Sequence, residues 1–229
     1  MRSPALVAAA GLLAYGAWLL YRQDEGEGSP ALDEDGGDWL ATADDVLTST
    51  GETAAEFVDN LTGGILKVSA MARVNWADLN HPNVQAILRV IREGEGTAGP
   101  NGYRILFGGG LFDGYADHPR RAVTRTMGGR PITSTAAGAY QILASTWDET
   151  KRIMGLPDFS PRSQDLAALG RIAARGALED VKAGRFESAI RKIAREWASL
   201  PGSPYGQPTI SWERARTIYA SAGGDVMTA

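Results

Sequence analysis

The sequence contains no cysteine and only two histidines. The absence of cysteine excludes thiol catalysis, cysteine-ligated zinc, iron–sulfur clusters and disulfides. His81 and His118 lie far apart and each precedes a proline, so neither a histidine metal site nor a histidine-based triad is expected. We therefore expect no metal and no cofactor. The groups that remain for chemistry are mainly carboxylates, hydroxyls and basic side chains.

Charge is distributed unevenly along the 229 residues. Residues 24–38 carry seven acidic side chains and no basic one, whereas residues 79–229 carry 19 Lys and Arg against 14 Asp and Glu, a net charge of +5. A basic domain suits a polyanionic partner, either nucleic acid or an anionic wall polymer or lipid. We do not expect nucleic acid, because the chain has no basic recognition helix and no aromatic–basic motif.

Residues 3–21 carry no charged side chain. As a helix rising about 1.5 Å per residue, they would span roughly 28 Å, close to the bilayer's hydrocarbon core of about 30 Å. Tyr15, Trp18 and Tyr21 lie toward one end, where aromatic side chains favour the membrane interface. The run predicts a transmembrane anchor over residues 1–22, with a lipid bilayer as partner through residues 3–21. A cleaved signal peptide is the alternative.

Residues 23–80 are interpreted as an acidic linker followed by a stalk. Residues 23–37 are rich in glycine and acid and predict a solvated tether. An amphipathic helix is expected over residues 38–60, and the glycine pair Gly63-Gly64 is expected to break it. The stalk either packs on a membrane or partner or is a partly ordered linker.

The domain over residues 81–229 begins with a helix start at Asn80-His81-Pro82-Asn83. Apolar residues from Val84 to Ile91 then recur at i, i+3, i+4 and i+7, and the next position on that stripe is Glu95. Glu93 faces elsewhere, toward neighbouring arginines. Burial at the end of the stripe would raise the pKa of Glu95 and keep it protonated near neutral pH, as a general acid requires. The alternative is a helix-end glutamate that turns to solvent.

A segment of strand and turn character follows. Tyr103–Phe107 precede three consecutive glycines, which exclude a helix interior and predict a tight β-hairpin. The glycines do not match a phosphate-binding loop, because no G-K-S/T follows. The next glycine-containing loop is either an anion-facing lip or a solvated surface, and it carries Arg120, Arg121, Arg125 and Arg130.

The rest of the domain predicts short helices separated by loops. Residues 199–208 hold three prolines and two glycines and must form a loop. Expected helices cover residues 138–153, 164–175, 178–183, 186–198 and 212–222. Ser160 is expected to cap the second of these helices, with Pro161 at its first helical position. The expected fold class is therefore α+β and mostly helical, of lysozyme type, with a small β-hairpin, preceded by the transmembrane helix and linker.

Six ordered segments resemble the lambda-type phage endolysin family, over residues 84–224. They are REGEGT, GGGLFDGYADHPR, STAAGAYQ, a following Trp, GLPDFSPRSQD and WASLPGSPYGQ. The resemblance implies a lytic transglycosylase with a lysozyme-like fold that acts on peptidoglycan glycan strands. The family's catalytic glutamate ends the first helix in an E-G-T motif, and Glu95-Gly96-Thr97 is the match here.

The resemblance also implies substrate contacts. Residues 123–134 and 199–211 correspond to two loops that form the lips of a saccharide cleft. Tyr140, Gln141, Tyr205 and Gln207 lie on matching motifs and are the candidates for lining it. For two of them a structural role is the alternative: Tyr140 in the core and Tyr205 as an anchor of its loop.

The expected chemistry breaks the β-1,4 bond between N-acetylmuramic acid and N-acetylglucosamine and forms 1,6-anhydromuramic acid. A lytic transglycosylase needs one carboxylate, whereas a hydrolytic muramidase generally needs two. Asp113 or Asp117 would be the second carboxylate of that muramidase alternative. A catalytically silent wall-binding protein is the other alternative.

The first 80 residues have no counterpart in the soluble endolysin. The chain is therefore interpreted as a single-pass membrane protein of the virion membrane or host envelope, whose catalytic domain acts on the periplasmic cell wall at entry or lysis. Other virion membrane or capsid proteins are further candidate partners.

Overall fold

The structure, a computed structural model, describes residues 54–127 and 129–225. The chain divides into two units, residues 1–66 and a compact unit of residues 67–229. The expected anchor, the acidic linker and most of the helix expected over residues 38–60 lie outside the described residues. Helix α3 (Ala54–Ala72) runs through Gly63-Gly64, so the expected break there is wrong. A glycine costs a helix only about 1 kcal/mol relative to alanine, and a pair weakens a helix without having to end it.

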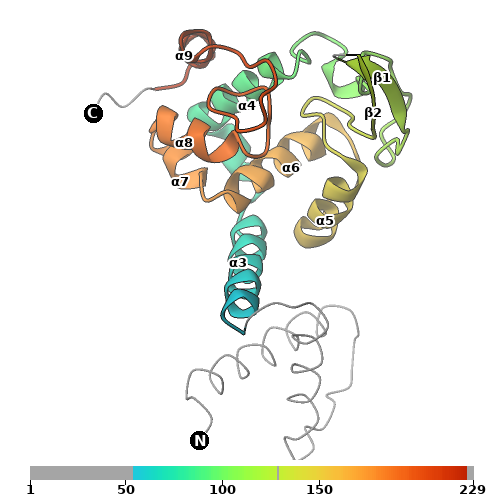
Figure 1. Cartoon of the computed structure of the whole chain (residues 1–229). Helices are drawn as coiled ribbons and strands as arrows, with labels where there is room; N and C mark the ends of the chain where they lie inside the picture. The colour runs from blue at the N-terminus through green and yellow to red at the C-terminus, as the bar shows by residue number, and fades with distance from the viewer. Residues whose placement is uncertain (1–53, 128, 226–229) are drawn as a thin grey trace, which may run out of the picture. The chain divides into compact units, whose positions relative to one another are not determined.

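Six further helices and one hairpin make up the described part of the compact unit (Figure 1). The hairpin and α5 lie on one side of the unit and α7, α8 and α9 on the other, with α4 and α6 between them. The helices are α4 (Pro82–Gly94), α5 (Ala144–Met154), α6 (Pro161–Ala174), α7 (Leu178–Lys182), α8 (Phe186–Ile193) and α9 (Trp212–Ser221). Short 3-10 turns lie at Trp76–Asn80 and Gly102–Arg104.

Helix α4 is the centre of the core. Its apolar stripe is buried as predicted, with Val84, Ile87 and Ile91 fully shielded from solvent, and it packs against α6, α7 and α9. The helix begins where the sequence indicated. The capping side chain is His81, whose Nδ1 accepts from the backbone N–H of Asn83 at 3.2 Å.

The β-hairpin lies later in the chain than predicted. Strands β1 (Val123–Met127) and β2 (Arg130–Ser134) pair antiparallel, with Val123 opposite Ser134 and Met127 opposite Arg130. The glycine triplet forms only a tight turn with a single bridge between Ile105 and Leu111. Both strands are largely exposed, so they lack the alternating apolar pattern that identifies a strand, and their segment was expected to be a loop.

Two predicted helices are shorter than expected. The helix expected from residue 138 begins only at Ala144, because Gly138 and Gln141 have left-handed backbone angles, with φ of 77° and 46°. The helix expected to reach residue 198 ends at Ile193. The predicted start of α6 is confirmed: Ser160 caps it and Pro161 follows at the first helical position.

Among the residues described, no helix combines the length and the apolar character that crossing a bilayer requires. The architecture is mostly helical with one small two-stranded sheet, as the sequence predicted.

Candidate functional site

Glu95 sits at the C-terminal end of α4, in a tightly closed helix cap. Gly96, with φ of 70°, is the left-handed residue that follows it. The N–H of Gly96 donates to the carbonyl of Glu93 at 3.3 Å, and the N–H of Thr97 donates to the carbonyl of Arg92 at 2.8 Å. These two bonds define a Schellman cap. The E-G-T sequence is therefore a structural unit that ends the helix and holds the backbone of Glu95.

The Glu95 carboxyl is partly buried and has one side-chain hydrogen-bond donor, Ser199. The Ser199 hydroxyl donates to Oε1 of Glu95 at 2.6 Å. Burial raises the pKa of Glu95 above its ordinary value, and the hydrogen bond from Ser199 offsets part of that rise. The sequence prediction of a desolvated carboxyl at this position is consistent with this environment.

Gly94 allows Ser199 to approach the helix end. A Cβ atom at position 94 would lie 2.7 Å from the Ser199 hydroxyl oxygen and 3.3 Å from its Cβ. Any side chain larger than hydrogen would therefore push Ser199 away. The two glycines that flank Glu95 have separate roles: Gly96 supplies the left-handed angle and Gly94 supplies the space.

Glu95 lies in a cleft with a volume of 410 Å³. The cleft is lined mainly by the end of α4, the turn before α5, the last residue of β2 and the segment from Glu196 to Pro208. The residues that line it are Glu95, Phe107, Ser134, Ala136, Tyr140, Gln141, Ile142, Leu143, Thr146, Arg171, Glu196, Trp197, Ala198, Ser199, Gln207 and Pro208. The cleft places the partly buried carboxyl of Glu95 where a bound ligand can reach it.

Three of the four predicted substrate-binding residues line this cleft. Tyr140 and Gln141 belong to the turn before α5, and Gln207 belongs to the loop before α9. Gln141 holds a left-handed conformation although it is not glycine, and its side-chain amide donates to the carbonyls of Gly138 and Ile105 at 3.0 and 3.2 Å. Strained backbone of this kind persists where surrounding contacts enforce it, often at functional sites.

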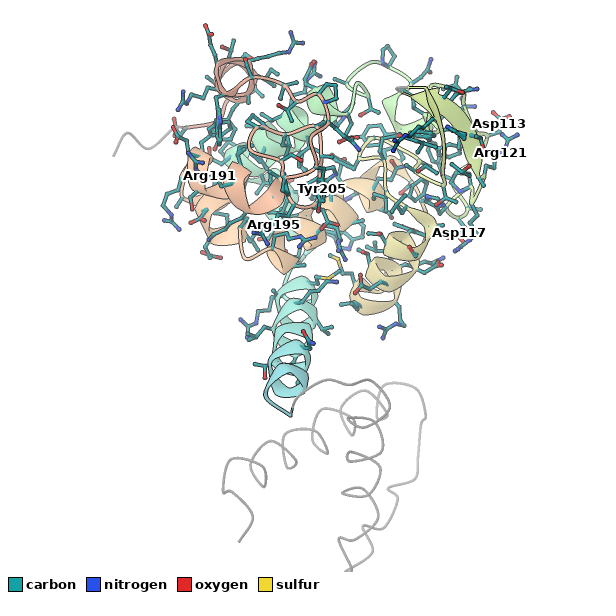
Figure 2. All side chains as sticks on the ribbon, viewed as in Figure 1. Asp113, Asp117, Arg121, Arg191, Arg195 and Tyr205 are labelled. Atoms are coloured by element: carbon teal, nitrogen blue, oxygen red, sulfur yellow. The ribbon has the colours of Figure 1, made fainter. Side chains whose placement is uncertain are left out.

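The fourth, Tyr205, does not line the cleft. Its side chain is 55% exposed, and its hydroxyl donates to the backbone carbonyl of Arg195 at 2.9 Å. Figure 2 shows Tyr205 beside Arg195. This contact ties the loop that carries Gln207 to the segment that follows α8. The anchoring role named above as its alternative is therefore the one that its contacts support.

Polar residues that the sequence analysis missed hold the Tyr140 turn against Glu95. The buried Thr97 hydroxyl donates to the carbonyl of Ala139, and the Gln164 side chain accepts from the N–H of Ala139 at 2.9 Å. The next residue, Asp165, accepts from the Tyr140 hydroxyl at 2.6 Å. The signal available in the sequence was the polar pair Gln164-Asp165 at the start of an otherwise Ala- and Leu-rich helix.

The cleft holds a second carboxylate, Glu196, but this one is ion-paired. Arg171 contacts Oε1 and Arg175 contacts Oε2, each at 2.7 Å. Glu196 is therefore held in an ion-pair network between two arginines. In the described part of the chain, Glu95 has no such ion pair.

Asp113 and Asp117, the second carboxylates considered above, are not among the cleft residues. Figure 2 shows both on the side of the unit that carries the hairpin and α5. The side chain of Asp113 is 98% exposed and paired with Arg104. Asp117 accepts from Trp147 Nε1 at 2.8 Å and pairs with Arg120 and Lys151, and these donors hold its pKa well below the ordinary range despite partial burial.

Glu93 points away from the cleft, as the helix phase predicted. Its carboxylate pairs with Arg89 at 2.6 Å and with Arg214 of α9 at 3.7 Å. It therefore joins α4 to α9 on the surface. Across residues 54–127 and 129–225, no group of three or more His, Asp and Glu side chains is placed to hold a metal ion.

A helical domain with a small sheet and a cleft that holds Glu95, a partly buried glutamate without an ion pair in the described part of the chain, is typical of a lysozyme-like enzyme of polysaccharide cleavage. Comparison with known proteins identifies it more closely. The endolysin family model matches residues 85–226, and the chain belongs to this family.

Named relatives agree with this assignment. The endolysin of Escherichia phage P2 is 40% identical over 156 residues, covering 63% of this chain and 94% of the relative. The endolysin of Escherichia phage lambda is 43% identical over 126 residues, covering 55% and 78%. Bacteriophage lambda lysozyme complexed with a chitohexasaccharide is similar in structure, with a TM-score of 0.58 and 39% identity over 63% of this chain and 96% of that one. The chain is a lambda-type phage endolysin with a lysozyme-like fold, and it degrades peptidoglycan.

The localisation inferred from the sequence, a single-pass protein of the virion membrane or host envelope, is wrong. The curated relatives that the chain matches are named as endolysins. None of the helices in the described part could cross a bilayer. The uncharged run at residues 3–21, on which that inference rested, lies outside the described residues.

Proposed function

We propose that this endolysin is a lytic transglycosylase with Glu95 as its single acid and base. It would cleave the β-1,4 bond between N-acetylmuramic acid and N-acetylglucosamine and open the cell wall locally, at entry or at lysis. The observation that carries the proposal is the contrast between the two cleft carboxylates. Burial raises the pKa of Glu95, which has no ion pair in the described part of the chain, whereas Glu196 forms ion pairs with Arg171 and Arg175.

The proposed reaction uses the same carboxyl group twice. Protonated Glu95 gives its proton to the glycosidic oxygen as the bond to the anomeric carbon breaks. The resulting carboxylate then takes the proton of the sugar's own 6-hydroxyl, whose oxygen attacks the anomeric carbon and closes the 1,6-anhydro ring. Water is not consumed. The Ser199 hydroxyl donates to the Glu95 carboxylate between the two steps and stabilises its charge.

The proposed glycan contacts come from the residues that surround Glu95. Gln141 and Gln207 line the cleft and offer two carboxamides to hydroxyl and acetamido groups. Tyr140 is only 1% exposed and donates its hydroxyl to Asp165, so it is proposed to contribute as a buried part of the cleft wall. Tyr205 is proposed to act indirectly, by holding the loop that presents Gln207. The chitohexasaccharide bound by the lambda lysozyme supports a cleft built for N-acetylated sugar chains.

The mass of the product tests the proposal. Purified peptidoglycan digested by the enzyme is expected to yield fragments with 1,6-anhydro-N-acetylmuramic acid ends, each lighter by one water than a hydrolytic product. Reducing N-acetylmuramic acid ends would overturn it.

The rival function is a hydrolytic muramidase. The observation in its favour is that Glu196 lines the same cleft as Glu95. A hydrolytic product that disappears in Glu196→Gln would assign Glu196 as base or nucleophile. Anhydro product from wild type and from that variant would support the transglycosylase.

A further inference from the structure

A second pocket, with a volume of 470 Å³, opens beside the catalytic cleft. Phe107 lines both, so the two share a wall. The pocket lies between the glycine turn and strand β1, and its lining residues are Leu106, Phe107, Gly110, Leu111, Arg121, Ala122, Val123, Thr124 and Arg125. None of the mechanistic steps above uses it.

Two arginines of this pocket have free guanidinium groups. Within residues 54–127 and 129–225, neither Arg121 nor Arg125 has an ion pair or a side-chain hydrogen bond. Nearby arginines are different: Arg104 pairs with Asp113, and Arg120 pairs with Asp117 and Asp148. The pocket therefore presents two positive charges without an ion-pair partner in the described part of the chain, beside the cleft with which it shares Phe107.

The backbone before Arg121 is held in one conformation. Arg120 has a left-handed φ of 52°, and its N–H donates to His118 Nδ1 at 3.0 Å. The buried ring of His118 is fixed at its other nitrogen by the carbonyl of Ile142 at 2.9 Å. Arg120 itself reaches Asp148 at 2.8 Å. As a result, the side chains of these adjacent arginines point in different directions: Arg120 contacts α5, and Arg121 lines the pocket.

Arg125 is positioned by a glycine. A Cβ atom at Gly108, which has a φ of 78°, would lie 2.4 Å from Arg125 Nε and 2.7 Å from its Cγ. The stem of Arg125 therefore lies directly across the glycine turn. A side chain at position 108 would displace this stem, so the glycine leaves room for Arg125 to lie along the pocket.

We propose that Arg121 and Arg125 bind the carboxylates of the peptide stems that peptidoglycan carries. This inference rests on the proposed function, because a stem projects from each N-acetylmuramic acid of a strand lying in the cleft. The stems carry free carboxylates, and a guanidinium group binds a carboxylate through two parallel hydrogen bonds. The pocket would make the enzyme prefer glycan that still bears its stems over bare glycan.

Arg121→Gln/Arg125→Gln tests this on two substrates. One is purified glycan with charged stems and free of phosphate polymers; the other is the same glycan with its stem carboxylates converted to amides. The double variant is expected to raise KM about tenfold on the charged glycan and to leave it unchanged on the amidated glycan. The KM of wild type should rise by the same factor when the stem carboxylates are amidated. The kcat of both proteins should stay within twofold on both substrates.

Arg73→Gln/Arg152→Gln is the matched control, because it removes the same charge from two exposed arginines that line neither pocket. A control that weakens binding as much as the test variant would assign the effect to net charge and overturn the proposal. An equal loss on both glycans, no loss on either, or a loss only on walls that bear phosphate polymers would also overturn it. Failure of wild type to cleave either glycan would instead remove the proposed function.

Discussion

The Ser199 hydroxyl donates to Oε1 of Glu95 at 2.6 Å, although the two residues are 104 positions apart in the chain. One belongs to the cap of α4 and the other to the segment between α8 and α9. The hydrogen bond from Ser199 lowers the pKa of Glu95 and so offsets part of the rise that burial causes. It is therefore a positioning residue, whose removal changes both the proton affinity and the orientation of the acid.

Ser199→Ala is expected to shift the pH profile toward alkaline pH. The hydrogen bond favours the charged carboxylate, so its loss raises the pKa of Glu95 further. In the proposed mechanism Glu95 is protonated at the start, so the alkaline fall in kcat/KM should move to higher pH. The rate at the optimum should drop by about 10- to 100-fold, because the acid is no longer held in place. An unmoved alkaline limb in a folded variant would contradict the assignment.

Gly94→Ala is expected to reproduce that shift without touching a functional group. The added methyl would lie 2.7 Å from the Ser199 hydroxyl and displace it from Glu95. Alanine favours a helix over glycine by up to about 1 kcal/mol, so the melting temperature should not fall. Adding Ser199→Ala to Gly94→Ala should cause little further loss, because both remove one interaction. Additive losses would show that Gly94 acts by another route.

The position of Glu95 at the end of a buried helical face could be predicted, because the pattern that indicates it lies within a short stretch of sequence. A buried helical face repeats at fixed spacing, and Val84 to Ile91 set the phase that separates Glu95 from Glu93. The same reasoning indicated the helix starts at Pro82 and Pro161, which depend on neighbouring residues only. Each of these features depends only on residues that lie close together in the sequence.

The supporting contacts could not be predicted in this way. Thr97 bonds to Ala139, which is 42 positions away, and Gln164 bonds to the same residue from α6. The hairpin was misplaced because the exposed strands carry no apolar alternation. The helix expected from residue 138 started late because Gln141 adopts a backbone angle that side chains usually avoid, and only the folded contacts enforce it.

Asp117→Asn is expected to cost stability and not activity. Asp117 binds Trp147, Arg120 and Lys151, and these contacts lower its pKa in the folded state. Its ionised form therefore contributes stability above the unfolded pKa of about 3.9, and this contribution disappears as pH falls through the folded pKa. The pairs are well solvated, so the loss at pH 7 should be about 1 kcal/mol, or roughly 2–4 °C in Tm.

Activity of Asp117→Asn, measured well below its melting temperature, should stay within a few-fold of wild type. The gap in Tm between the two proteins should narrow as the pH is lowered toward 2. Loss of activity with an unchanged Tm would instead identify Asp117 as the second carboxylate of a muramidase.

Glu95→Gln and Glu93→Gln make opposite predictions for two neighbouring glutamates. Glu95→Gln keeps the shape of the side chain but removes the transferable proton. General acid–base assistance contributes about 10²–10⁴-fold, and one residue here would serve both steps, so the loss should reach the upper part of that range. Glu93 is a surface partner of Arg89 and Arg214, so its substitution should change activity only a few-fold and stability by at most about 1 kcal/mol.

Stability gives Glu95→Gln a second readout. Burial raises the folded-state pKa of Glu95, so the folded state of wild type is most stable while this carboxyl is protonated. Wild type then loses stability as pH rises from the unfolded pKa of about 4.3 through the folded pKa, whereas the amide does not titrate. The free energy of unfolding of Glu95→Gln relative to wild type should therefore increase over that interval and then stay constant. If Glu95→Gln degraded purified peptidoglycan as fast as wild type, the assignment of Glu95 as the catalytic acid would be refuted. If the difference in unfolding free energy between the two proteins did not change with pH, burial of an ionisable carboxyl at Glu95 would be refuted.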